Sequence, residues 1–185
     1  MAGADGFLTS FKAGVDGNFA RAYLFYATIT RQPIGLTSLA KQKYLVRSTS
    51  MPQSTIEQIE VPFQGMLYKM ASTSTFDTWE CTFNADNDMK LRKYFVDWMK
   101  LVHDPKTNKH GSPENYYGEI QIDMLNPFQT FDNTSDPKIK YKSTLFQCWP
   151  SVVGAIDLAY DSKEIAQFPV TLTYGWHEEE TIAGT

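Results

Sequence analysis

Few side chains in this sequence have the type and spacing that catalysis or metal binding requires. His103, His110 and His177 are its three histidines, and no ligand spacing relates them to one metal ion. The chain also lacks the GxxxxGK[ST], GxGxxG, GxSxG and HExxH motifs of phosphate loops, dinucleotide sites, hydrolases and zinc proteases. We therefore predict exposed, solvated histidines, no metal, no cofactor and no enzyme activity.

Asp86, Asn87 and Asp88 form a cluster of oxygen ligands that could suggest a cation site. A calcium loop would also need a glycine and a distal glutamate, which this stretch does not have. Side-chain acceptors and negative charge are equally what the first turn of a helix favours. The cluster is predicted to start a helix.

Two further motifs have plain structural interpretations. Cys81 and Cys148 each lie in a strand-like pattern, which favours buried free thiols over a disulfide or a metal pair. The tripeptide Asn133-Thr134-Ser135 matches a glycosylation acceptor, but Met1–Asp16 lacks the pattern of a secretory signal, so a turn is predicted.

No stretch approaches the ~18 consecutive apolar residues of a membrane span. We expect a soluble protein made in the cytoplasm, with no membrane partner.

The charge balance limits which partners the surface can bind. Seventeen Lys and Arg against 21 Asp and Glu give a formal net charge of −4, which excludes a surface that is basic overall and binds nucleic acid. Lys138, Lys140 and Lys142 still place three ammonium groups on one face of a strand. This stripe is either an edge strand protected from aggregation by lysines or a contact surface for an acidic neighbour.

Strands dominate the elements that must position these groups. The apolar spacing predicts one helix, over residues 88–102, followed by a mobile surface loop over residues 103–116. The strand after Lys138 is expected to stop where Trp149-Pro150 interrupts the pattern. Alternating or β-rich segments occur at Ala22–Thr30, Lys41–Ser50, Ile56–Phe63, Met66–Ala71, Phe76–Asn84, Tyr117–Leu125, Lys138–Cys148 and Ile165–Trp176.

These elements predict a mainly β fold, an antiparallel β-sandwich or barrel with one packed α-helix. The chain has 185 residues and no internal linker, which suits one domain over residues 18–176. Residues 1–17 are predicted to be an N-terminal arm, and residues 177–185 a frayed acidic tail.

The alternation separates a candidate core from a candidate polar face. The core candidates lie on the apolar sides of the strands and helix: Trp79, Leu91, Phe95, Trp98, Phe168, Val170 and Leu172. The polar sides of other strands carry Glu60, Glu80, Glu119, Gln121 and Asp123. In a monomeric sandwich such a face is simply solvated.

Several segments, taken in order, resemble the tail tube protein of contractile-tailed bacteriophages of the T-even type, which is related to the tube proteins of pyocins and type VI secretion. The segments run from residue 18 to residue 176. They are Asn18-Phe19-Ala20-Arg21 with Leu24-Phe25, Thr75-Phe76-Asp77 with Trp79, Phe95-Val96-Asp97-Trp98, Trp149-Pro150-Ser151 with Val153-Gly154, Leu158, Asp161-Ser162, Glu164-Ile165, and Phe168 with Val170-Thr171-Leu172, Tyr174 and Trp176.

The resemblance implies a structural subunit whose six copies form a ring, with the sheets joined into one continuous inner barrel. Stacked rings would form the conduit for genome ejection inside a contractile sheath, in a virion tail assembled in the host cytoplasm. The implied partners are further copies of the chain, the tail sheath, baseplate, tail terminator and tape measure proteins, and double-stranded DNA passing through the lumen.

This implication gives the polar face a possible role. A basic lumen would bind DNA at every ring through counterion release, whereas an acidic or neutral lumen leaves DNA hydrated and mobile. We therefore expect some of Glu60, Glu80, Glu119, Gln121 and Asp123 to line the channel.

Assembly needs further contacts. The hairpin Ile56–Ala71 is suited to donating backbone hydrogen bonds to a neighbour, and the arm Phe7–Val15 and the loop Asp104–Tyr116 could reach the adjacent ring or the sheath. Two alternatives share the fold, a tube initiator at the baseplate and a secreted ring protein of a type VI system. A small-molecule enzyme on a β-barrel would need convergent titratable groups, which the sequence does not offer.

Overall fold

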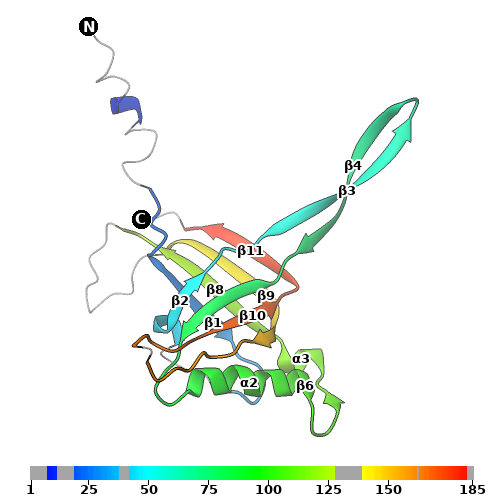
Figure 1. Ribbon diagram of the computed structural model, residues 1–185. Coiled ribbons are helices and arrows are strands. Elements are labelled where there is room, and N and C mark those ends of the chain that lie inside the picture. Colours follow the sequence, from blue (N-terminus) through cyan, green and yellow to red (C-terminus); the bar gives the residue numbers. More distant parts are fainter. Residues whose placement is uncertain (1–7, 12–18, 38–41, 128–138, 162, 183–185) are drawn as a thin grey trace.

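The computed structural model describes residues 8–11, 19–37, 42–127, 139–161 and 163–182, and its described part is mainly antiparallel β-structure (Figure 1). Besides a helical turn at residues 8–11, the helices are the 3-10 turn η1 (Gln42–Tyr44), α2 (Lys90–Val102) and α3 (Pro113–Tyr116). The strands are β1 (Phe25–Arg31), β2 (Val46–Thr49), β3 (Ser54–Phe63), β4 (Met66–Phe76), β5 (Trp79–Asn84), β6 (His103–Asp104), β7 (Lys109–His110), β8 (Gly118–Leu125), β9 (Ile139–Val153), β10 (Gln167–Thr173) and β11 (Trp176–Thr181).

One long strand, β9, belongs to two layers. Its first part pairs with β8 on one side and β11 on the other, and its last residues pair with β10. The first layer therefore has the order β1-β8-β9-β11, and the second continues from β9 through β10 and β5 to β2. Gln147, with φ of 56°, lies where β9 passes from one set of partners to the other. The local left-handed backbone lets the strand turn this corner without ending.

The sheet is open, so the barrel half of the predicted fold class is not what a single chain forms. The path of paired strands begins at β1 and ends at β2, and β11 pairs only with β9. No strand in the described residues joins these ends. In the described residues three strands of this sheet, β1, β2 and β11, therefore lie at its edges, which is the arrangement that a single closed barrel would abolish.

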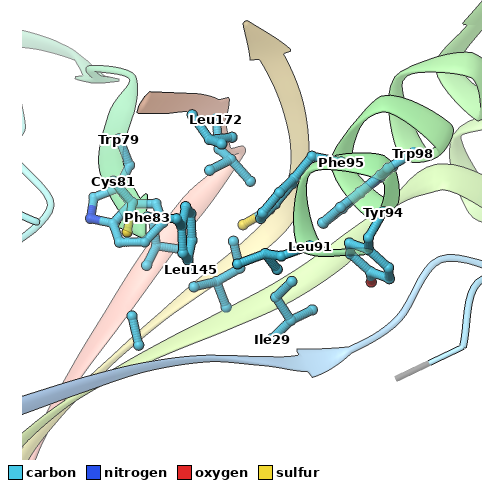
Figure 2. Close-up of a cluster of buried hydrophobic side chains, with 14 of the residues drawn as sticks. Ile29, Trp79, Cys81, Phe83, Leu91, Tyr94, Phe95, Trp98, Leu145 and Leu172 are labelled. Carbon is cyan, nitrogen blue, oxygen red and sulfur yellow. The ribbon is translucent and has the colours of Figure 1, made fainter. Parts of the chain in front are cut away.

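The core lies between the two layers and is covered by α2, which lies below the sheets in Figure 1. Figure 2 shows Phe95 of α2 close to Phe83 of β5, and their ring centroids are 5.2 Å apart. Trp98 donates from Nε1 to the carbonyl oxygen of Tyr116 at 2.7 Å, so its polar atom is satisfied. All seven core candidates are buried: Trp79, Leu91, Phe95, Trp98, Phe168, Val170 and Leu172.

Helix α2 begins at Lys90, two residues later than predicted. Met89, with φ of 52°, occupies the cap position and makes no side-chain cap bond. Asp86 serves instead: its carboxylate accepts from the backbone nitrogens of Lys90 at 3.0 Å and Leu91 at 3.2 Å. The cluster therefore starts the helix through its first member.

The strands β3 and β4 form the predicted hairpin, which extends beyond the upper right of the sheets in Figure 1. It turns at Gln64 and Gly65, both with positive φ. Gly65 suits this position because glycine adopts φ of 82° without strain. Every residue of β3 is exposed, and so is every residue of β4 except Ser72 and Phe76.

Four sequence-based predictions about segments need correction. Residues 177–181 are not a frayed tail, since all of β11 pairs with β9. The strand β9 runs through Trp149-Pro150, because Pro150 lies at a register shift opposite β10, where no ladder donor is needed. The segment 103–116 contains the β6–β7 hairpin and α3 rather than a plain loop. Lys140 and Lys142 lie between two paired strands, so the protected-edge interpretation of the lysine stripe is wrong for them.

Other predictions concern residues that the structure does not describe. Lys138, the Asn133-Thr134-Ser135 turn and the N-terminal arm 1–17, apart from a helical turn at 8–11, lie outside the described residues.

Candidate functional site: a polar sheet face and an exposed hairpin

The five predicted channel residues lie in three places. Glu119, Gln121 and Asp123 share one side of β8 and are brought together. Glu80 is exposed on β5, in the other layer, and Glu60 lies on the projecting hairpin. The structure therefore supports one site built around β8 and separates Glu60 and Glu80 from it.

The register of the first layer defines this site, which we call the polar face. Across β8 and β9, Asp123 lies opposite Lys142, and Gln121 lies opposite Thr144. The rows continue to β1 and to β11, with Glu180 opposite Lys142. The polar face consists of Tyr26, Thr28, Glu119, Gln121, Asp123, Lys142, Thr144, Phe146, Trp176, Glu178 and Glu180.

The contribution of β11 to this face is not among the predictions from the sequence. Trp176, Glu178 and Glu180 alternate with His177 and Glu179, which is the period-2 signal of a strand. Taken alone, the run of three glutamates favours a frayed acidic tail, but the partner strand β9 supplies Lys142, which pairs with Glu180.

Charges of both signs are paired on the polar face. Lys142 Nζ lies 2.8 Å from Glu180 Oε2, and Arg31 at one end of β1 lies 3.3 Å from Glu119 Oε1. Gln121 donates from Nε2 to Asp123 Oδ1 at 2.7 Å. The face is thus acidic in excess but contains its own counter-charges.

Asp123 differs from its neighbours because it is only 6% exposed. Burial raises the pKa of its carboxyl group, and the hydrogen bond from Gln121 and the charges of Lys142 and Lys43 oppose that rise. The carboxyl group is therefore a positioned member of the face rather than a freely solvated charge.

The other end of the polar face is aromatic. The rings of Phe146 and Trp176 stack with centroids 4.0 Å apart and planes inclined by 15°. Trp176 is exposed, so this end offers apolar surface beside the charged rows.

Neither edge of the first layer is paired with a further strand in the described residues, although the carbonyl oxygen of Ile29 in β1 accepts hydrogen bonds from the side chains of Gln32 and Gln42. The outer edges of β1 and β11 have no partner strand, and neighbouring strands in the order β1-β8-β9-β11 all run antiparallel. Strand direction therefore alternates across the layer. Consequently β11 of one copy would meet β1 of a second copy in antiparallel orientation.

The hairpin has one apolar side with nothing packed on it among the described residues. The opposed pairs Phe63 with Met66, Val61 with Tyr68 and Ile59 with Met70 all point to this side. Their exposed fractions are large, for example 66% for Phe63, 77% for Met66 and 65% for Tyr68. We call these six residues the apolar side of the hairpin.

The opposite side of the hairpin is polar over most of its length. Lys69 Nζ lies 3.4 Å from Glu60 Oε1, and Gln58 donates to the same Glu60 oxygen at 3.5 Å. Pro62 and Leu67 complete this side near the turn. The hairpin is therefore amphipathic, with one side fit for water and one that needs a partner.

The remaining reactive groups of the described residues are histidines and buried thiols. Burial raises the pKa of both Cys81 and Cys148 to about 12, which leaves unreactive thiols. His103 and His110 meet across β6 and β7 with centroids 4.5 Å apart, but no set of three metal-binding side chains occurs in the described residues. The prediction of three solvated histidines is wrong for His177, whose side chain is only 9% exposed. None of the helices described is long and apolar enough to cross a membrane.

Several solved structures have a similar fold at low sequence identity, and two of them come from assemblies that contain a tube. A chain from the tube-terminating cap of the anti-feeding prophage has a TM-score of 0.65 and 15% identity, covering 89% of this chain and 93% of that one. A chain from the sheath-tube complex of the extracellular contractile injection system PVC has a TM-score of 0.63 and 14% identity, covering 92% and 97%. Hcp1 from Flavobacterium johnsoniae has a TM-score of 0.50 and 8% identity, covering 86% and 96%.

Sequence comparison gives the family directly. No curated protein sequence matches this chain. The family model for phage tail tube protein matches residues 20–180, which include both the open first layer and the exposed hairpin. The chain belongs to the phage tail tube protein family, a family of structural tube proteins.

Proposed function

We propose that this protein is the structural subunit of a tail tube, in which rings of six copies stack into the conduit for genome ejection inside a contractile sheath. The apolar side of the hairpin carries the proposal. Six large apolar residues on a projecting two-stranded arm are a poor surface for a monomer, and a further copy of the chain would cover them.

Ring closure would use the two free edges of the first layer. Joining β11 of one copy to β1 of the next would give each edge strand a partner and would continue the antiparallel pattern. Six layers joined in this way would make one closed inner barrel, which removes the edges that the single chain leaves open. The predicted domain 18–176, extended by the residues of β11, would supply this ring, and the arm 1–17 would reach the next one.

The polar face would line the channel. Its acidic excess, with Glu119, Glu178 and Glu180 exposed or half-exposed, would repel a polyanion, while Lys142 is already paired with Glu180. DNA would then pass without the counterion release that makes basic surfaces adhesive. Of the five channel candidates we retain Glu119, Gln121 and Asp123, which share this face.

Stacking would use the hairpin. Its apolar side would pack on a subunit of the adjacent ring, with the Glu60–Lys69 side left toward water. The tail sheath, baseplate, terminator and tape measure proteins would be the other partners, in a virion tail assembled in the host cytoplasm.

Electron microscopy of the recombinant full chain tests the proposal. We expect stacked rings with a central hole, and we expect Val61→Asp with Tyr68→Asp to give rings that do not stack. The matched control is Glu60→Gln on the opposite side of the hairpin, which should leave tubes intact. A wild-type chain that stays monomeric at high concentration would contradict the proposal.

A second candidate within the same family is a tube initiator at the baseplate or a secreted ring protein of a type VI system. The similarity to a chain of a tube-terminating cap favours keeping it, since end proteins and tube proteins can share one fold. Copy number in the purified particle separates the two, because only a tube subunit is present in many copies.

A further inference from the structure

The hairpin of β3 and β4 is joined to the body at one end only. Residues 50–53 lead into β3, and Asp77 and Thr78 lead from β4 to β5. Ten residues of strand span about 33 Å. A rotation of only about 10° at the base would therefore move the tip by roughly 6 Å, so the contacts at the base determine where the apolar side points.

A cluster of three rings holds this base. Phe76, the last residue of β4, lies with its ring centroid 5.9 Å from that of Tyr174 and 5.4 Å from that of His177. Tyr174 and His177 are themselves 5.9 Å apart. The two contacts of His177 are edge contacts and the Phe76–Tyr174 contact is tilted, and all three separations lie in the favourable range for aromatic pairs.

Hydrogen bonds hold the other connection to the same place. Tyr174 donates from its hydroxyl to the carbonyl oxygen of Gln53 at 3.1 Å, one residue before β3. Trp79 donates from Nε1 to the carbonyl oxygen of Ser50 at 2.7 Å. Both ends of the hairpin are thus tied to buried aromatic residues of the second layer and its continuation.

The body side of the cluster is firmly placed. Tyr174 is 6% exposed, and the side chain of His177 is 9% exposed. His177 Nδ1 is buried without a hydrogen-bond partner, and Nε2 lies 3.8 Å from Glu179 Oε1. Since one of its nitrogens is unsatisfied, the imidazole contributes at this position mainly as a packed ring.

We infer that Phe76, Tyr174 and His177 form a clamp that sets the direction of the hairpin in the free subunit, before any neighbour is bound. The inference rests on the proposed function for its purpose, because an arm that is already oriented loses less freedom on docking. Without the clamp the strand ladder would persist, but the hairpin would swing about its two connections.

Distance measurement between spin labels in the full chain tests the clamp. Labels are placed at Leu67→Cys near the hairpin tip and at Lys93→Cys on α2, both at exposed positions. The native thiols are buried, with pKa values of about 12, and stay unlabelled. Diluting labelled chains into excess unlabelled protein restricts the signal to one subunit.

The clamp predicts one narrow distance distribution in the wild-type background. His177→Ala and Phe76→Ala should each broaden it, and Tyr174→Phe should do so less, because only the bond to Gln53 is lost. His177→Phe is the matched control and should stay narrow, since it keeps a ring. Any of three results would overturn the inference. The distance distribution of the wild type could be broad, that of both alanine variants could be unchanged, or that of His177→Phe could be broad.

Phe76→Ala keeps the test decisive if His177→Ala does not fold, because Phe76 is half-buried at the edge of the core. Electron microscopy of the same chains separates the two proposals. A narrow distribution without tubes leaves the clamp standing and the tube function refuted. Normal tubes together with a broad distance distribution in the wild type would refute the clamp and leave the tube function standing. If the clamp and the tube function are both correct, His177→Ala should raise the subunit concentration needed to form tubes by about tenfold.

Discussion

At the scale of single residues, Gly118 shows how closely β8 and α2 approach. A Cβ atom at this position would lie 2.7 Å from two ring carbons of Trp98 and 3.0 Å from the carbonyl oxygen of Arg31. Trp98 is fully buried, so its ring has no room to move away. The small residue is required by the contact and not by its backbone angles.

We expect Gly118→Ala to lower the free energy of unfolding by about 1–3 kcal/mol, the usual cost of overpacking a core. Denaturant unfolding followed by tryptophan fluorescence measures this. Thr30→Ala, at an exposed position of the neighbouring β1, is the control and should change little. A Gly118→Ala chain as stable as the wild type would show that the helix can shift to admit a methyl group.

Asp123 and Asp97 should give opposite pH dependences. The raised pKa of Asp123 means that the folded chain holds a proton that the unfolded chain releases above the ordinary pKa of about 3.9. Its contribution to stability is thus present below that pH and is lost as pH rises through the raised folded value. The stability difference between wild type and Asp123→Asn should therefore fall with rising pH across the acidic range.

For Asp97 the hydrogen bonds from Lys100 and Lys93 lower the pKa, so the dependence of its stability contribution on pH is opposite to that of Asp123. Its contribution is present above the ordinary pKa and is lost as pH falls. The difference between wild type and Asp97→Asn should accordingly rise with pH. Urea unfolding at a series of acidic pH values measures both, and parallel trends for the two variants would contradict the assignment.

Residue-level patterns predicted the core better than the polar face. Trp79, Phe168 and Leu172 were identified by alternation because the buried side of a strand must be apolar. Asp123 was expected to be exposed, yet Tyr26, Lys43 and Lys142 come from other segments to surround it. The alternation of residues along a strand assigns each side chain to one side of the sheet, but it does not reveal which other segments cover that side.

At the scale of elements, α2 depends on an acceptor outside its own first turn. The Asp86 carboxylate accepts from two backbone nitrogens of the helix, whereas the Asp88 carboxylate bonds only the exposed ammonium group of Lys90. Asp86→Ala should lower the free energy of unfolding by about 1 kcal/mol.

Asp88→Ala is the matched control for this prediction. An exposed ion pair contributes little, so this variant should be close to the wild type. Thermal or denaturant unfolding of both variants makes the measurement. Equal losses would mean that the acidic charge, rather than the backbone bonds, is what the helix start requires.

The hairpin was the element most visible in the sequence, because two alternating runs flank Gly65. Strand β11 was hidden by its composition, since three glutamates suggest solvent until the partner strand is known. The continuation of β9 through Pro150 was equally hidden. Proline usually ends a strand, and only the register shift opposite β10 makes it harmless here.

At the scale of the whole molecule, the proposed ring makes the two sides of the subunit differ in access. Thr144 lies at the middle of the polar face, whereas Glu80 is exposed on β5 of the other layer. In assembled tubes, a thiol at Thr144→Cys should react with a small maleimide and not with one carrying a long polymer chain.

Glu80→Cys is the control for accessibility and should react with both reagents in tubes. Both variants should react with both reagents as free subunits, while the native thiols stay silent because they are buried. Equal reaction of Thr144→Cys and Glu80→Cys with the polymer reagent in tubes would place the polar face on the outside.

Fold class at this scale followed from the sequence, because the count of strands and the single helical stripe allow few architectures. Closure did not, since whether a sheet meets itself depends on the strand order, which short-range patterns do not encode. The free edges of β1 and β11 appear only once that order is known.

The shared strand β9 also has a mechanical consequence. Because one backbone runs through both layers and turns at Gln147, a force applied to the first layer reaches the second along covalent bonds. Two layers held only by side-chain packing could slide past each other under load. In this molecule sliding would first require β9 to be peeled from its neighbours, so the inner and outer walls of a loaded tube would deform as one piece.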